Sequence, residues 1–427
     1  MIKNNSKSIL LKNARLYDPF SNSEIIGSVF IEDGLIKDIG EEIVFNKAKE
    51  INCENKIVTA GFIDVHAHFR EPGREDKETL QSGSIAAFCG GYTRVCVMPN
   101  TNPPLDSPES IRYIIQKSLN LPVKIYPIGA ITVGQKGEEL TEIGKMVDAG
   151  AIGISDDGIP VQNGQMMRYA IQYAQKYNVP VINHAEDIYL RNNGVMNESL
   201  CSTSLGLPGI PDISESVMVH RDLEIAEFCS GRLHIPHVST RKSVELIKKY
   251  KALGVNVTSE VTPHHIGLTE KKLIDYDTSA KVAPPLRSES DRDSLINALK
   301  DGTIDCIATD HAPHTTEEKE MDFLHAPCGM IGLESAFGLS HTILRKHEIS
   351  TKKIIQWFTS GPASVLGLTI EPFKLDSNAE LVIVDPNKKW TFSKSDIKSR
   401  SKNSPMLGMN FKGKVIAGIS GNYTFGL

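Results

Sequence analysis

Histidine and aspartate residues at the ends of short apolar segments are the side chains in this sequence that could carry chemistry. His66 and His68 end the segment GFIDVHAHF. Because alternate residues of a β-strand point to the same side, both imidazoles should leave such a strand on one face. Imidazole nitrogens and carboxylate oxygens are donor atoms that bind divalent ions of the zinc type, so this pair predicts part of a metal site.

Other apolar segments end in the same way. Asp156 and Asp157 follow AIGIS, His184 follows VPVIN, His237 follows GRLHIP, and Asp310 follows IDCIAT. A single histidine at the end of a strand is usually a structural, hydrogen-bonded residue, and an isolated HxH pair is a weak signal. Nitrogen and oxygen ligands at the ends of five such segments, with no thiolate among them, predict a site for one or two divalent ions.

The segments that carry these residues belong to a series that alternates with amphipathic helical patterns, such as SPESIRYIIQKSLN and GQMMRYAIQYAQKYN. Near-continuous apolar strands between such helices are typical of parallel strands buried on both faces. We therefore predict an α/β fold with a (β/α)8 TIM barrel over residues 56–368, whose chemistry lies at the C-terminal ends of the strands. The strand-like segments are 61–69, 92–100, 123–131, 151–158, 179–186, 231–239, 256–265 and 304–312.

The two ends of the chain lack this alternation of strand-like and helical patterns. SILLKNARLYD and GSVFIEDGLIKDIG near the start read as short strands, the second with EDG as its hairpin turn, and AELVIVDP and GKVIAGISGNYTF near the end read alike. We predict that residues 1–55 and 369–427 pair into one small β domain beside the barrel.

Composition excludes several classes of protein. The chain has 427 residues and a formal net charge of −5, with no basic runs, which argues against nucleic acid as a partner. The longest apolar runs are the length of a strand, so no membrane span is expected. The cysteines are odd in number and form no CxxC pair, which is typical of reduced thiols in a cytoplasmic protein.

Several motifs of the sequence resemble those of a known family. DVHAHFREPG, MPNTNPP, SDDG, HAED, HVST and TDHAPH are similar to the motifs of dihydroorotases of the class I bacterial type, in the amidohydrolase superfamily. The resemblance implies a hydrolase that cyclises N-carbamoyl-L-aspartate reversibly to L-dihydroorotate, a step of pyrimidine (UMP) biosynthesis. It leaves open a homodimer and an association with aspartate carbamoyltransferase.

The same resemblance implies roles for individual residues. It implies two zinc ions per subunit bridged by Asp157, with Asp310 both as a ligand and as the catalytic acid and base. The remaining implied metal ligands are His66, His68, His184 and His237. The implied substrate contacts are His68, Arg70, Asn100, His314, Cys328 and Gly329.

Two departures from the family pattern concern recognition of the substrate ring. Ala283 stands where the family usually has asparagine, and Cys328 where it often has phenylalanine. The nearest alternative is another cyclic amidase, such as a hydantoinase, dihydropyrimidinase or allantoinase. Those relatives generally bridge their metals with a carboxylated lysine, and GISDDG has no lysine. A metal-free homologue that serves a transcarbamoylase as a scaffold would be expected to lose ligands, and all six are present.

Overall fold

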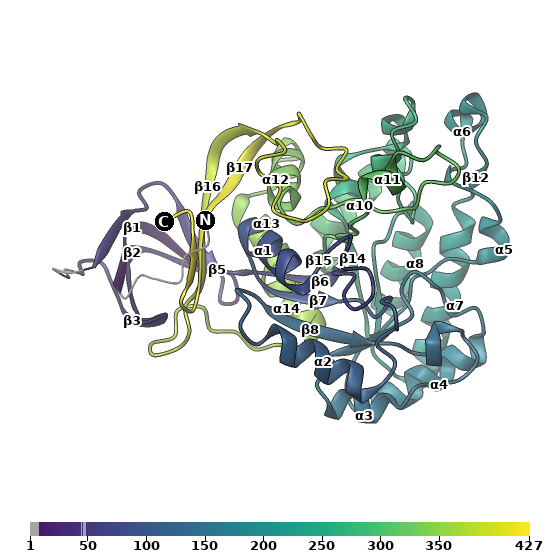
Figure 1. Cartoon of the computed structure of the whole chain (residues 1–427), viewed down its shortest axis with the longest axis horizontal. Helices are drawn as coiled ribbons and strands as arrows, with labels where there is room; N and C mark the ends of the chain where they lie inside the picture. The colour runs from purple at the N-terminus through teal and green to yellow at the C-terminus, as the bar shows by residue number, and fades with distance from the viewer. Residues whose placement is uncertain (1–7, 44, 46–47) are drawn as a thin grey trace.

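The computed structural model of the chain describes residues 8–43, 45 and 48–427, and its strands form two large sheets (Figure 1). One sheet closes into a barrel, on the right in Figure 1, and the other, in purple and yellow on the left, is built from both ends of the chain. Within the described residues, no helix is both long and apolar enough to cross a membrane.

Parallel strands form the barrel in the hydrogen-bonded order β6-β7-β8-β9-β10-β13-β14-β15. A parallel bridge between Ala67 and His311 joins the first strand to the last and closes the ring. Each strand lies inside one of the eight segments selected from the sequence, so the predicted barrel is confirmed. Their bounds are β6 Phe62–Ala67, β7 Tyr92–Val97, β8 Lys124–Gly129, β9 Gly153–Ser155, β10 Val181–Ile182, β13 Leu233–Ile235, β14 Val257–Val261 and β15 Cys306–Ile307.

Helices cover the outside of the barrel, and α2 (Pro108–Ser118) illustrates how local sequence sets their position. The Ser107 hydroxyl accepts a hydrogen bond from the Ser110 N–H at 3.3 Å, and Pro108 stands in the first turn, where no N–H is needed. The other long helices are α1 Leu80–Gly90, α4 Gly164–Gln175, α7 Ile213–Cys229, α8 Arg241–Ala252, α10 Glu289–Asp301, α12 Ala336–Lys346, α13 Thr351–Phe358 and α14 Ser360–Leu366. Shorter ones are α3 Ile143–Asp148, α5 Ile188–Arg191, α6 Leu200–Leu205, α9 Pro263–Gly267 and α11 Thr316–Lys319.

The second sheet joins the two ends of the chain. β1 pairs antiparallel with β2, which forms a hairpin with β3 through Asp33 and Gly34, both with positive φ, as a tight turn requires. β1 also pairs with β4 and β5, and β5 pairs with β16. The bounds are β1 Ser8–Asp18, β2 Ser23–Glu32, β3 Leu35–Gly40, β4 Lys49–Asn52, β5 Ile57–Ala60, β16 Glu380–Thr391, β17 Asn410–Ser420 and β18 Tyr423–Phe425.

The predicted pairing of the two chain ends is therefore confirmed. Residues 1–7 of the predicted small domain lie outside the described part of the chain, and the sheet continues to Ala60 at the end of β5. The boundaries at 55 and 369 stay a prediction.

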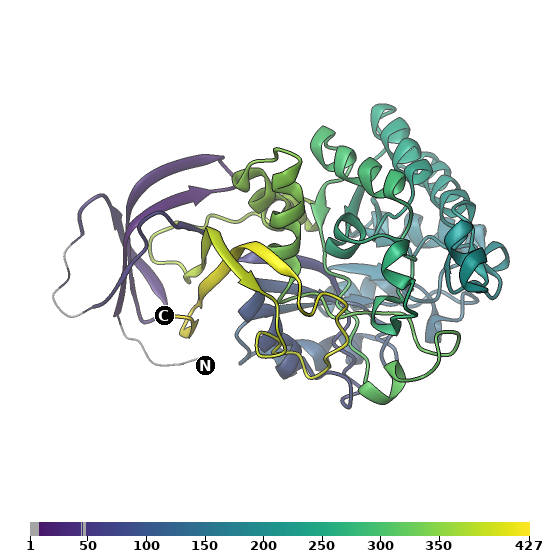
Figure 2. The same cartoon turned by 90° about the horizontal axis from the view of Figure 1, so that it is seen from above.

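One part of the C-terminal region does not stay in the terminal sheet. The segment between β16 and β17 crosses to the barrel, as its yellow trace shows in Figures 1 and 2. Phe392, Ile397 and Met406 are buried in one apolar cluster with Leu268 and Met330 of the barrel. This segment is thus packed against the end of the barrel at which the candidate site lies.

Candidate active site

The residues predicted to bind metal come together at the C-terminal ends of the barrel strands. His66 and His68 lie at the end of β6, and Asp157, His184, His237 and Asp310 follow β9, β10, β13 and β15. His237 and Asp310 have φ angles of 34° and 46°. Left-handed backbone at residues other than glycine costs about 1–3 kcal/mol each and is concentrated at functional sites.

Asp157 lies at the centre of this cluster. Its Oδ1 is 3.5 Å from His66 Nε2, 3.4 Å from His237 Nε2 and 3.7 Å from His184 Nδ1. Its Oδ2 is 3.5 Å from His68 Nε2. Most of these separations are too long for good hydrogen bonds, and they leave room for an ion between the donor atoms.

Asp310 approaches the same cluster from the last strand. Its Oδ1 lies 3.0 Å from His68 Nε2 and 3.7 Å from His66 Nε2. Burial would raise the pKa of Asp157 and of Asp310, but the neighbouring imidazoles, when charged, lower the pKa of both carboxyls well below the usual range. Both groups are therefore carboxylates that can face a cation.

The donor atoms fit a binuclear metal site. His66 Nε2 and Asp157 Oδ1 are buried and have no hydrogen-bond partner among the described residues, a costly state unless an ion satisfies them. His66, His68 and Asp157 form one group whose donor atoms lie within 4.8 Å of one another, and Asp157, His184 and His237 form a second. The two groups share Asp157, which indicates two metal positions with a common carboxylate.

Asp156, the neighbour of Asp157, points away from the metal cluster. Its Oδ1 accepts hydrogen bonds from the backbone N–H groups of Ile131 and Thr132, at 2.8 Å and 3.2 Å. Burial raises its pKa to about 6. Asp156 thus ties β9 to the loop after β8, whereas Asp157 faces the histidines.

A buried carboxylate that the sequence analysis missed stands behind His66. Glu260 Oε1 lies 2.8 Å from His66 Nδ1, and its Oε2 lies 3.1 Å from His234 Nε2. With Nδ1 donating to Glu260, the Nε2 of His66 is left with its lone pair toward the cluster. The signal in the sequence was an acidic residue inside the strand-like segment NVTSEV, where an unpaired charge in a buried strand would be unfavourable.

Asn100 has a related role in the structure. Its Oδ1 lies 2.8 Å from His68 Nδ1, so the residue predicted as a substrate contact also orients a metal-ligand candidate. It lines the cavity as well.

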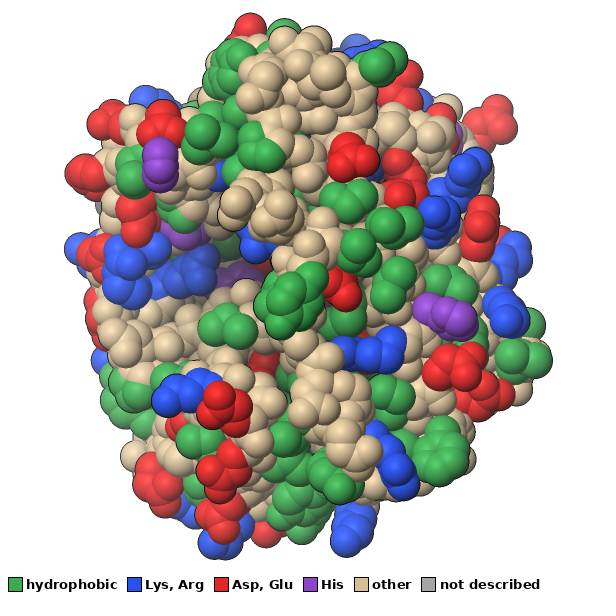
Figure 3. Space-filling model, turned by 90° about the vertical axis from the view of Figure 1, so that its right-hand side faces the viewer, with side chains coloured by type: hydrophobic (Ala, Val, Ile, Leu, Met, Phe, Trp, Pro, Cys, Tyr) green, Lys and Arg blue, Asp and Glu red, His purple; other side chains and the backbone are tan. Residues whose placement is uncertain are grey.

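A cavity of about 310 Å³ opens above the cluster and is lined by every predicted substrate contact. Figure 3 shows a hollow on this side of the molecule, with histidine side chains beside those of lysine or arginine. Glu186 and Arg191, which the sequence analysis did not select, also line the cavity, and Ala283 adds no polar group to its wall. The lining residues that were predicted are His68, Arg70, Asn100, Asp157, His184, His237, Asp310, His314, Cys328 and Gly329.

Arg70 and His314 form one side of this cavity, and the positive charge of that side is on Arg70. Arg70 Nε donates to the Pro313 carbonyl at 3.3 Å, and the Arg70 φ of 60° turns the chain there. His314 Nε2 lies 2.8 Å from the Cys328 carbonyl, which requires a proton on Nε2. Burial and the nearby charge of Arg70 lower the pKa of His314 to about 2, so its imidazole stays neutral.

The segment HTTEEKEMDFLHAP follows β15 and leads from His314 toward Cys328. It contains the short helix α11 and ends next to Cys328, which lines the cavity. Lys281 Nζ donates to the carbonyls of Phe323, Leu324 and Ala326, at 2.7, 3.0 and 2.7 Å. Lys281 thus fixes the backbone of this loop at three carbonyl groups.

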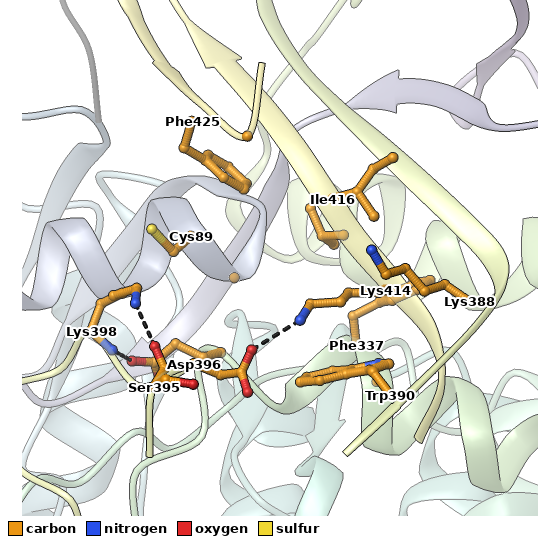
Figure 4. A pocket seen from close by; sticks show the side chains of 15 residues that line it. Cys89, Phe337, Lys388, Trp390, Ser395, Asp396, Lys398, Lys414, Ile416 and Phe425 are labelled. Carbon is orange, nitrogen blue, oxygen red and sulfur yellow. Dashed lines mark hydrogen bonds and ion pairs between the residues drawn. The ribbon is translucent and has the colours of Figure 1, made fainter. Parts of the chain in front are cut away.

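A second cavity, of about 340 Å³, lies between α1, α12 and β17 (Figure 4). Its Lys414 donates to Asp396 at 2.9 Å and lies 3.9 Å from the centroid of the Trp390 ring. Within the described part of the chain, neither group of metal-ligand donors lies in this cavity. The chemistry therefore belongs to the cavity above Asp157.

Known proteins match both the sequence and the fold. A family model described as dihydro-orotase-like matches residues 55–243. The chain is 43% identical to a dihydroorotase of Caldanaerobacter subterraneus, over 95% of this chain and 94% of that protein. It is 42% identical to one of Syntrophotalea carbinolica, over 98% and 99%.

Among solved structures, an L-hydantoinase from Arthrobacter aurescens has a TM-score of 0.84 at 24% identity, covering 97% of this chain and 94% of that one, which shows a shared fold. The identity to dihydroorotases extends over nearly the whole chain, and the two groups of metal-ligand donors in the barrel share Asp157. The chain therefore belongs to the dihydroorotase family of metal-dependent cyclic amidohydrolases.

Proposed function

We propose that this chain interconverts N-carbamoyl-L-aspartate and L-dihydroorotate in pyrimidine biosynthesis, with two zinc ions bridged by Asp157. The observation that supports this best is the cavity itself, which combines a cluster of histidines and carboxylates with an arginine. The ring of dihydroorotate carries a carboxylate, and a planar guanidinium binds such a group through two parallel hydrogen bonds. Arg70, with Asn100 and His314, would hold that carboxylate.

The donor set suits zinc, since it consists of imidazole nitrogens and carboxylate oxygens. His66 and His68 would hold one ion, with Asp310, and His184 and His237 would hold the other. Zinc at such a site lowers the pKa of a water molecule and polarises a carbonyl group.

Asp310 would move the proton of the reaction. In the hydrolytic direction, water adds to the ring amide carbonyl and the carbon–nitrogen bond of the ring breaks. The Asp310 carboxylate accepts the proton that the water loses and delivers it to the departing ring nitrogen. In the direction of cyclisation the same group removes a proton from the ureido nitrogen and releases it with the water.

The test is to measure turnover of dihydroorotate, hydantoin, dihydrouracil and allantoin side by side, together with the metal content. We expect two zinc ions per subunit and preference for dihydroorotate. Arg70→Ala should abolish this preference, whereas Ala283→Asn should be neutral or mildly beneficial. Faster turnover of a neutral ring, with Arg70→Ala harmless, would assign the chain to another cyclic amidase activity.

We also propose a cytoplasmic location, a homodimer, and association with aspartate carbamoyltransferase. The location is supported by the cysteines, all of which have free thiols in the described structure. Light scattering of the purified protein, alone and mixed with the transcarbamoylase, would test both associations. The boundaries of the small β domain, at residues 55 and 369, belong to the same set of proposals.

A further inference from the structure

A short stretch of the C-terminal region, Ser399–Asn403, lies against the loops that form the candidate active site. It belongs to the segment between β16 and β17 that crosses from the terminal sheet to the barrel (Figures 1 and 2). The side chains of Ser399, Ser401 and Asn403 are buried, and Lys402 between them is exposed. None of these residues lines the cavity, so an effect on substrate would have to act through the loops.

Asn403 bonds the loop after β15 at two places. Its Oδ1 accepts a hydrogen bond from the His314 N–H at 3.1 Å. Its Nδ2 donates to the carbonyls of Ala312 and Gly329, both at 3.1 Å. One amide group therefore joins two stretches of this loop, around Ala312–His314 and at Gly329, that both line the cavity.

The same stretch also holds the loop after β6, which contains Arg70. Ser401 Oγ donates to the Lys77 carbonyl at 2.8 Å, and the Arg400 N–H donates to Glu78 Oε1 at 3.1 Å. Ser399 hydrogen-bonds the same Glu78 carboxylate through its hydroxyl group. Ser399–Asn403 thus fastens together the two loops that meet at the cavity.

The contacts of Asn403 are linked to Arg70 through one further hydrogen bond. Asn403 bonds Ala312 and His314, the residues on each side of Pro313, and the Pro313 carbonyl accepts the Arg70 Nε–H at 3.3 Å. The orientation of the guanidinium thus depends on a peptide whose position Asn403 sets. Binding of an anion requires that the groups which bind it are held in place to within a fraction of an ångström.

We propose that Asn403 is a positioning residue for the carboxylate-binding side of the active site, so that the C-terminal segment completes a pocket made otherwise by the barrel. This inference rests on the proposed role of Arg70 and His314 in binding the substrate carboxylate. Asn403 itself touches no substrate. It acts by fixing the Ala312–His314 peptide and Gly329.

The test compares Asn403→Ala and Asn403→Asp with Asn410→Ala, an exposed asparagine of the same region. Asn403→Asp keeps an acceptor for the His314 N–H but sets a carboxylate against two carbonyls, so it should be as harmful as the alanine. We expect KM for dihydroorotate to rise by about 10- to 100-fold, the effect of losing buried hydrogen bonds. We expect kcat and zinc content to change little, and Asn410→Ala to match the wild type.

Inhibitor binding separates positioning from a general structural defect. Orotate, a ring with a carboxylate, should lose affinity in the Asn403 variants in parallel with the substrate, whereas uracil, a neutral ring, should bind as before. Equal losses for both rings, or a fall in kcat with KM unchanged, would overturn the proposal. If Asn403→Ala does not fold, Asn403→Asp carries the same test, because it keeps the size of the side chain and the acceptor for the His314 N–H and loses both donations to carbonyls.

The proposed function can fail separately. If Arg70→Ala leaves KM and orotate affinity unchanged, the carboxylate is bound elsewhere and the proposed role of Arg70 is wrong. If Arg70→Ala weakens orotate binding and the Asn403 variants do not, the site is as proposed and only the inference about Asn403 fails.

Discussion

Asp157 and Asp310 belong to one cluster of carboxylates and imidazoles, but their surroundings suit different tasks. Both carboxylates line the substrate cavity. The nearest imidazole nitrogens approach both oxygens of Asp157, whereas those nearest Asp310 approach its Oδ1. A carboxylate that moves protons needs an oxygen that can face the reacting atoms, so this difference supports the proposed acid and base role of Asp310.

The substitution Asp310→Asn tests this assignment. The amide keeps an oxygen for an ion but cannot accept and release a proton, so kcat should fall by about 10²- to 10⁴-fold with most of the zinc retained. Steady-state kinetics and elemental analysis measure the two effects. Asp301→Asn, at an exposed ion pair with Lys248, is the matched control. Turnover near that of the wild type would remove Asp310 from this role.

Glu260 permits a prediction about affinity for metal rather than about rate. Burial would raise the pKa of Glu260, but the hydrogen bonds from His234 and His66 are among the contacts that lower it to about 2, so Glu260 is a carboxylate. Glu260→Gln removes the charge that holds the Nδ1–H of His66, and affinity for zinc should fall by about 10- to 100-fold. Dialysis against a graded chelator measures this, with Glu109→Gln at an exposed site as control. Unchanged zinc retention would contradict it.

At the scale of elements, the site depends on loops that carry little regular structure. Some strands end before their metal-ligand candidates: β10 ends at Ile182, before His184, and β15 ends at Ile307, before Asp310. Beyond the strand ends, hydrogen bonds from side chains fix the backbone of the loops. Asp156 accepts from the Ile131 N–H after β8, and Lys281 donates to the Phe323 carbonyl in the loop before Cys328. The loops can therefore be loosened one at a time without opening the barrel.

Lys281→Met should loosen one of them. Three carbonyl groups of Phe323–Ala326 lose their donor, so amide exchange in this loop should increase and KM for dihydroorotate should rise. Binding of dihydroorotate should slow the same exchange in the wild type, because Cys328 and Gly329 line the cavity. Hydrogen-exchange mass spectrometry measures both, and Lys300→Met on the exposed side of α10 is the control. Exchange that responds neither to the substitution nor to the ligand would contradict this account.

At the scale of the whole molecule, metal binding and folding should be coupled. The donors of the cluster come from several strands of the barrel, and without ions they would be buried with little compensation. At 100 to 1,000 times its dissociation constant, a ligand that binds only the folded state adds about 3–4 kcal/mol to the free energy of unfolding. Chelated protein should therefore melt at a lower temperature than protein reloaded with zinc. Calorimetry with and without metal measures this, and equal melting temperatures would count against ions that bridge the strands.

The sequence by itself determined the barrel, the shared sheet of the chain ends and the set of candidate ligands. Each has a local signal: period and length for the strands, and polar residues where an apolar strand ends. The tertiary structure alone decided that Asp157 and not Asp156 faces the histidines, a choice the resemblance to the family had implied and spacing could not make.

The tertiary structure also revealed three contacts that the sequence analysis did not predict. Glu260 bonds His66, Lys281 bonds the loop before Cys328, and Asn403 of the C-terminal segment bonds His314 of the barrel. These residues act through a few hydrogen bonds with partners distant in the chain, such as the bond that Asn403 accepts from the His314 N–H. Such contacts follow no period and leave no spacing to detect, because they arise only when packed elements bring distant segments within hydrogen-bond range.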